Sequence, residues 1–290
     1  MTISIKGGFM KRLALSSAAL AVSLGIAFPT TASAQRVIEE TLVVTDPTVA
    51  TAGNWLVGGA LEYWYISGDY IITDASNNVL AEGDIKYKQP GFNLYAGYGD
   101  FTVLFTSRSG DGTLDLAYAP GALGPATTLV SSARVEQEDR EISLRWIFSK
   151  SEHFAPYLLA GYSWTDYEEA ETLTTPGFIW TATGTPTRTK TIEYTAPLVG
   201  IGAILPFNEK FGVRVDGRLK FYSAKRTRSG FASDEGDGIG GDMTGTAYFN
   251  IVEGLNLQLG GRFTHLDAGD AGGTVSRWGW FGMLGYTHRF

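Results

Sequence analysis

The chain has 290 residues and a net charge of −7 at pH 7. It contains 37 glycines and 13% aromatic residues, but only 18% charged residues and no cysteine. The acidic balance argues against nucleic-acid binding, the low charge argues against a soluble enzyme of this size, and the missing thiols exclude disulfides and thiolate metal centres.

The N-terminal segment has the pattern of an export signal. Met10, Lys11 and Arg12 form a short basic region, and residues 13–28 are apolar or small. The Ala-Ser-Ala sequence at 32–34 fits the cleavage rule, so we predict that residues 1–34 are a cleaved signal peptide. An uncleaved membrane anchor is the alternative, but the apolar stretch is shorter than a transmembrane helix usually needs to cross the bilayer.

Residues 35–53 follow the predicted cleavage point, and we interpret them as a periplasmic N-terminal leader. Within this leader, residues 39–45 (EETLVVT) look like the short box by which outer-membrane receptors engage the TonB energy protein. The box adds an extended strand to its partner. Those receptors carry a plug and about twenty-two strands, and this chain is too short for both. We therefore expect an unstructured leader and keep energy coupling as an alternative.

From residue 54 onward, apolar and polar residues alternate, which is the pattern of strands with one apolar and one polar face. In 211–221, apolar residues and a glycine at odd positions alternate with a glycine and charged residues at even positions. Ten segments of this kind are predicted, at 54–66, 85–97, 101–113, 135–148, 155–167, 189–205, 211–225, 241–252, 255–267 and 276–290.

The links between these segments alternate in length. Short links lie at 97–100, 149–154, 206–210 and 252–254, and long polar links at 67–84, 114–134, 168–188, 226–240 and 268–275. Short turns on one side and long loops on the other are typical of a transmembrane barrel. We therefore predict an all-β fold: a closed antiparallel β-barrel of about ten strands over residues 54–290, with short periplasmic turns and long extracellular loops.

The C-terminal sequence WFGMLGYTHRF supports this fold through a resemblance. Leu284, Tyr286 and Phe290 place apolar residues at alternate positions before the chain end, although His288 departs from the pattern. This ending resembles the last strand of the bacterial outer-membrane β-barrel superfamily. The resemblance implies an outer-membrane location and a strand that the barrel-assembly machinery reads during biogenesis.

If apolar residues face lipid, the alternate positions line the lumen. The charged residues of this set are Glu62, Glu141, Arg145, Glu193, Arg214, Asp216, Arg218, Lys220, Arg262, Arg277 and Arg289. Because buried charges are costly unless paired, we predict ion pairs across a narrow interior. Two interpretations remain open. The pairs plug the barrel, as about ten strands leave little free space, or the cations guide anions through a small pore.

One set of residues in the sequence would suit catalysis. Ten-stranded barrels include the omptin surface proteases, whose His–Asp couple faces two acids across the rim. His265 and Asp267 would form the couple, and Glu82 and Asp84 the acids, with His265 as general base for water. The order here is His-x-Asp, whereas omptins have Asp-x-His, and both residues share a face with Phe263. We therefore predict no enzyme activity and no catalytic residues.

Ligand motifs are equally sparse. Residues 236–241 are glycine-rich with acids nearby, which would suit Ca²⁺, but a flexible outer loop is the simpler interpretation. No metal and no cofactor is predicted. Basic residues at 187–190 and 225–228 lie at the expected outer strand ends, where they would contact lipopolysaccharide phosphates or solvent.

The function predicted from these features is a structural or surface-interaction barrel in the outer membrane, with a largely plugged polar lumen. A narrow porin-like channel for small solutes, anions among them, is the alternative, and an omptin-like protease is a remote one. The expected partners are outer-membrane lipid, lipopolysaccharide and the assembly machinery, with no nucleic acid.

Overall fold

The computed structural model describes residues 46–50, 53–73, 78–122, 128–151, 153–180, 183–267 and 274–290. The predicted signal peptide (1–34) and the TonB-box-like residues 39–45 lie outside these ranges. Within the described part of the chain, no helix is long and apolar enough to cross a membrane.

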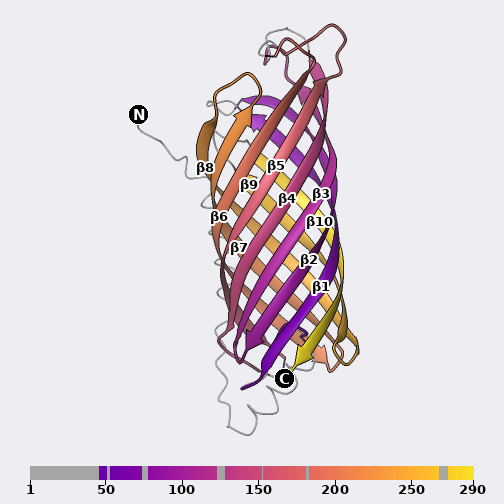
Figure 1. Cartoon of the computed structure of the whole chain (residues 1–290), viewed down its shortest axis with the longest axis vertical. Coiled ribbons are helices and arrows are strands. Elements are labelled where there is room, and N and C mark those ends of the chain that lie inside the picture. The colour runs from indigo at the N-terminus through magenta and orange to yellow at the C-terminus, as the bar shows by residue number, and fades with distance from the viewer. Residues whose placement is uncertain are drawn as a thin grey trace. The chain divides into compact units, whose positions relative to one another are not determined.

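Ten antiparallel strands form the described structure, which confirms the predicted fold (Figure 1). The strands are β1 Trp55–Thr73, β2 Val79–Tyr98, β3 Phe101–Tyr118, β4 Leu129–Ile147, β5 Ala155–Leu173, β6 Thr187–Asn208, β7 Phe211–Arg228, β8 Asp234–Val252, β9 Leu255–Asp267 and β10 Thr274–Arg289.

Each strand pairs with its neighbours in sequence, and β1 pairs with β10 to close the barrel. This seam runs from Leu56 opposite Arg289 to Ile71 opposite Thr274. Closure gives each strand a hydrogen-bonded neighbour on both sides, as a wall in contact with lipid requires. At the short-turn end, Gly99 and Gly254 adopt positive φ values of 58° and 79°, a conformation that tight hairpin turns require.

The strands are longer than predicted at the long-loop end, because the alternating pattern inverts there. In β4, Ile142, Leu144 and Trp146 are exposed on the outer wall, whereas Arg145 is buried inside. Further up the same strand the apolar Val135 is the buried residue, and the outer positions carry charged side chains. The alternation with apolar residues on the outer face therefore ends where the wall leaves the apolar band.

The lower part of the outer wall is an apolar band bordered by aromatic rings. Near the short turns, Trp55 packs on Tyr98 with ring centroids 5.0 Å apart, and Phe211 packs on Phe249 at 4.5 Å. The opposite border includes the pairs Phe263–Trp278 and Tyr162–Trp164, at 4.6 and 4.9 Å. Two aromatic girdles around an apolar band mark the two lipid–water interfaces.

The residues of the predicted assembly signal lie on this outer wall. Leu284, Tyr286 and Phe290 are 54%, 57% and 69% exposed, so they face lipid and not the lumen. The backbone N–H of Phe290 donates to the Trp55 carbonyl at 3.0 Å, which ties the chain end to the first strand.

Above the band, the interior becomes a conventional hydrophobic core. Its buried residues come from most strands and from the link after β5, and they are Tyr70, Ala81, Ile85, Tyr87, Leu114, Leu116, Tyr118, Leu129, Ala133, Val135, Tyr167, Leu173, Trp180, Ile192, Ala224 and Val275. This extracellular extension is therefore packed like a soluble protein, with its apolar side chains inside.

Candidate functional site in the barrel lumen

The structure places most of the predicted lumen charges inside the barrel. The interior set comprises Glu62, Glu141, Arg145, Arg214, Asp216, Arg218, Lys220, Arg262, Arg277 and Arg289. The prediction that Glu193 lines the lumen is wrong. Its side chain is exposed on the outer wall, between the inward-facing Ile192 and Tyr194. It lies in the extracellular extension, where the inner face is apolar and the outer face carries the charges.

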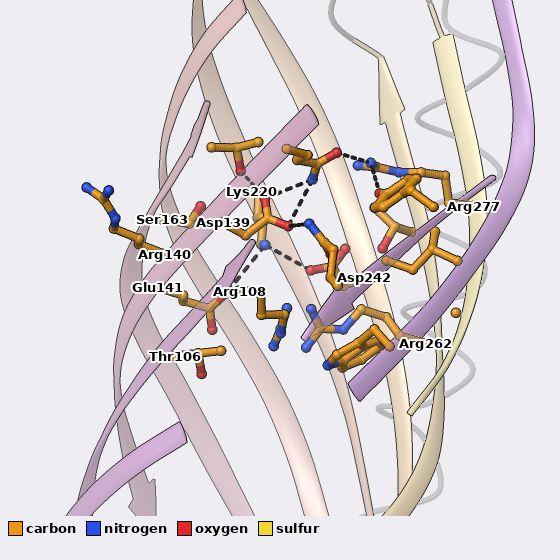
Figure 2. Close-up of a pocket in the computed structure, with 18 of the residues that line it drawn as sticks. Thr106, Arg108, Asp139, Arg140, Glu141, Ser163, Lys220, Asp242, Arg262 and Arg277 are labelled. Carbon is orange, nitrogen blue, oxygen red and sulfur yellow. Dashed lines mark hydrogen bonds and ion pairs between the residues drawn. The ribbon is translucent and has the colours of Figure 1, made fainter. Parts of the chain in front are cut away.

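A network of ion pairs crosses the middle of the lumen (Figure 2). Arg218 on β7 binds Glu141 on β4 at 2.5 Å and Asp216 on its own strand at 2.7 Å. Lys220 lies 3.0 Å from Asp242 on β8 and 3.4 Å from Glu141. Three strands from opposite sides of the barrel are thus joined through side chains, which fills the lumen at this height.

A second group of contacts lies around Trp64 on β1. Glu62 accepts a hydrogen bond from Arg108 Nε at 2.5 Å. The guanidinium groups of Arg108 and Arg262 lie 4.6 and 4.9 Å from the centroid of the Trp64 ring. Cation–π contacts of this kind stabilise cations that are shielded from water.

Sequence reasoning missed Arg108 and Asp139, although both lie on the polar inner face. Asp139 accepts hydrogen bonds from Gln89 at 3.0 Å and from Thr165 at 2.6 Å. It precedes Glu141 by two positions, so extending the alternation by one step would have found it. Near Arg108, the outward-facing residues of β3 change from apolar to polar. The alternation of apolar and polar residues therefore does not show which face Arg108 is on.

Residues 46–50 close the lumen at the short-turn end. Asp46, Thr48, Val49 and Ala50 are at most 3% exposed. Arg145 Nη2 donates to the Thr48 carbonyl and hydroxyl, both at 2.6 Å. These residues belong to the leader that we expected to be unstructured, and inward-facing polar side chains hold them instead.

Asp46 is the electrostatic anchor of this segment. Its carboxylate lies 3.2 Å from Arg214 Nη1, and it accepts hydrogen bonds from the Thr48 backbone N–H and hydroxyl. Burial would raise the pKa of Asp46, but the charges of Arg214 and Arg145 and the Thr48 hydrogen bonds together hold it below its ordinary value.

The opposite end of the lumen is closed by paired charges and aromatic rings. Lys190 binds Glu169 at 2.6 Å, and Arg188 binds Glu171 at 2.7 Å. The Arg188 guanidinium also stacks 3.5 Å from the ring of Trp180, which the link between β5 and β6 contributes. Both cations therefore face inward, which contradicts their predicted role as outward phosphate contacts.

In the second basic stretch, residues 225–228, two of the cations also form ion pairs. Arg226 pairs with Asp234 at the start of β8, and Arg228 lies 3.7 Å from the same carboxylate. Lys225 alone among the basic residues of 225–228 is exposed on the outer wall.

Three cavities follow one another between these two ends. The lower cavity is bounded by Thr48, and the middle one shares Arg108 and Glu141 with it. The upper cavity shares Gln137 and Arg277 with the middle one. Charged and polar side chains thus lie between neighbouring cavities.

The residues of the protease hypothesis do not meet inside the barrel. Glu82 and Asp84 are exposed on the outer wall of β2. His265 and Asp267 flank the buried Leu266, so they point away from the lumen, and His265 Nδ1 lies 2.9 Å from Ser276 Oγ. The omptin-like arrangement of a couple facing two acids across the rim is therefore wrong for these residues.

The glycine-rich stretch is strand and not loop. Residues 236–241 lie within β8 and pair with β7. Asp242, an acid next to this stretch, binds Lys220 inside the barrel. Among the residues that the structure describes, no group of three or more His, Asp or Glu side chains is arranged to hold a metal ion.

Comparison with known proteins places this geometry in context. No family model and no curated protein sequence matches the chain. The outer-membrane protease OmpT from Escherichia coli is similar in structure, with a TM-score of 0.59 and 8% identity over 84% of this chain and 100% of that chain. The translocator domain of autotransporter NalP from Neisseria meningitidis gives a TM-score of 0.46 and 12% identity over 95% and 98%.

At these identities the likeness concerns the fold and not the activity. The closed ten-stranded wall and the apolar band between two aromatic girdles agree with this likeness. The chain has the fold of a closed, ten-stranded outer-membrane β-barrel of the kind that OmpT shows.

Proposed function

We propose that the protein is a non-conducting barrel whose extracellular extension binds a partner at the cell surface. The observation that carries this proposal is that side chains block the lumen at three levels. Residues 46–50 occupy the periplasmic end, ion pairs around Arg218 cross the middle, and the cluster around Trp180 occupies the extracellular end. A barrel blocked in this way acts through its outer surface.

The chemistry of the extension suggests the kind of partner. On its outer wall, exposed acids outnumber exposed bases: the acids are Asp69, Glu82, Asp84, Asp111, Asp115, Glu136, Asp166, Glu168, Glu193, Glu235 and Asp237, and the bases are Lys86, Lys88, Arg134, Arg140 and Lys225. An acidic wall attracts basic partners over distances of about the Debye length, roughly 8 Å at physiological ionic strength.

Lipopolysaccharide remains a proposed contact, at different residues from those first considered. Lys88 and Arg140 are exposed next to the upper edge of the apolar band, where lipid phosphates lie. Figure 2 shows Arg140 extending away from the luminal side chains. The barrel-assembly machinery is likewise a proposed partner, through the lipid-facing Leu284, Tyr286 and Phe290.

Single-channel recording in a planar bilayer tests the proposal. The purified, refolded protein is expected to give no steady conductance, while a heat-modifiable gel band proves that the barrel has folded. Steady open steps from folded protein would contradict it.

A narrow channel for small anions is the second candidate, because the three cavities lie in series and arginines line each boundary. It predicts anion-selective steps that shrink when Arg218 is replaced.

A further inference from the structure

The lower cavity has more positive than negative charge in its walls. Five arginines line this cavity, but the lining includes only two carboxylates, Glu141 and Asp216. Both carboxylates already bind Arg218. For the other four arginines, the cavity lining therefore offers no carboxylate that is not already paired.

Arg145 is the clearest case of a cation without a direct ion pair, although the charge of Asp46 lies near enough to act on it. It is 1% exposed, and its Nη2 donates hydrogen bonds to the neutral oxygens of Thr48 and Thr102. Its Nε has no hydrogen-bond partner. Tyr157 provides a cation–π contact, with its ring centroid 5.4 Å from the guanidinium carbon. No carboxylate of the described residues lies within ion-pair distance of Arg145.

Arg262 presents the same deficit at the upper boundary of the cavity. Its Nε donates to the Thr244 hydroxyl at 3.1 Å, and its guanidinium lies over the Trp64 ring. It forms no ion pair with a carboxylate in the part of the chain that the structure describes. Two guanidinium groups thus face one cavity without a carboxylate partner.

A buried charge without a partner is costly, and the cost is removed when an opposite charge binds beside it. We propose that the lower cavity, whose lining includes Arg145 and Arg262, binds a small inorganic oxyanion of the phosphate or sulfate type. The planar guanidinium fork pairs with such oxygens in a bidentate manner. The neighbouring hydroxyl groups of Ser143 and Thr244, which also line the cavity, add neutral donors.

Asp46 takes part in this site from the periplasmic side. Its carboxylate already pairs with Arg214, which also lines the cavity, and Thr48 forms part of the cavity wall. The leader therefore supplies one built-in anion and covers the cavity towards the periplasm. Removing the Asp46 charge is expected to leave Arg214 free and to strengthen oxyanion binding. This site does not depend on the proposed surface role.

The test is calorimetric titration of inorganic phosphate into the refolded, detergent-solubilised full chain at constant ionic strength. We expect saturable binding of one phosphate per chain. Arg145→Met and Arg262→Met are each expected to weaken binding at least tenfold, and Asp46→Asn to tighten it. Arg140→Met is the matched control, because Arg140 is exposed on the outer wall and pairs with Glu138.

Each outcome decides the proposal. Equal phosphate binding by the wild type and by both luminal arginine variants would place the ligand elsewhere and overturn it, as would the absence of binding in both the wild type and Asp46→Asn. Binding by Asp46→Asn alone would support the site, with Asp46 as the competing anion. If a methionine variant fails to fold, lysine replaces it, and its point charge is expected to bind phosphate more weakly than the guanidinium fork.

Discussion

The same strands form two halves of this barrel whose apolar and polar side chains face opposite ways. In the lipid-embedded half, Leu144 is exposed on the outer wall and Arg145 is buried inside. In the extracellular half of the same strand, Val135 is buried inside and the charged Arg134 and Glu136 face outward. The backbone ladder continues unchanged across the transition.

This difference shows that burial and polarity are separate properties in a membrane barrel. Ion pairs and hydrogen bonds hold the embedded half together from within, because lipid removes any advantage of placing apolar residues inside. The hydrophobic effect holds the extension together, because water lies outside it. Mutations of the same type should therefore have opposite consequences in the two halves.

The largest effect is expected from breaking the central ion-pair network. Arg218→Met leaves Asp216 buried without an ion pair and leaves Glu141 with Lys220 alone. Loss of one member of a buried pair costs about 3–5 kcal/mol. Urea unfolding of the protein in lipid vesicles measures the change. Lys225→Met, on the outer wall of the same strand, is the control and should change stability by less than about 0.5 kcal/mol. A loss below about 1 kcal/mol for Arg218→Met would show that the lumen is well solvated.

The extension should respond as a soluble core does. Leu114→Ala removes a fully buried side chain from the upper cluster, and such truncations cost about 2–5 kcal/mol. Leu144→Ala removes the same atoms from a lipid-facing position and creates no internal cavity. The same unfolding assay should therefore give a clearly smaller loss for Leu144→Ala, and equal losses would contradict the division into two halves.

The position of the lipid boundary can be tested with charge insertion along one face of β1. Leu61→Arg places a cation in the apolar band, where arginine costs about 2–4 kcal/mol near the midplane. Asp69→Arg lies on the same face but in the extension, and should be close to neutral. Folding equilibria in vesicles of defined thickness provide the measurement, and similar costs at both positions would place the boundary elsewhere.

The smallest effect concerns the leader and depends on pH. Asp46→Asn removes hydrogen bonds to a charged group, which typically contribute about 1.5–3 kcal/mol. Because the pKa of folded Asp46 is lowered, its contribution is present above the ordinary aspartate pKa of about 3.9 and is lost as pH falls through the folded value. The stability difference between wild type and Asp46→Asn should thus shrink in acid, and a difference independent of pH would contradict the ion pair with Arg214.

Much of the architecture was predictable because alternation with period two is a local property. The ten strands, the short turns and the lipid-facing Leu284, Tyr286 and Phe290 all follow from neighbouring residues. The polar inner face of β7, with Arg214, Asp216, Arg218 and Lys220, follows from the same rule. The orientation of Glu193 did not follow from this rule, because Glu193 lies above the level at which the inner face becomes apolar and the outer face polar.

The sequence by itself determined the fold class, the strand count and the side of the wall that most charged residues face, because each strand must present an apolar surface to lipid. Only the tertiary structure decided which charges meet, that Asp46 returns into the lumen to reach Arg214, and that Arg145 and Arg262 are left without a carboxylate. These contacts join residues far apart in the chain, and they depend on strand register and barrel closure, which no local pattern specifies.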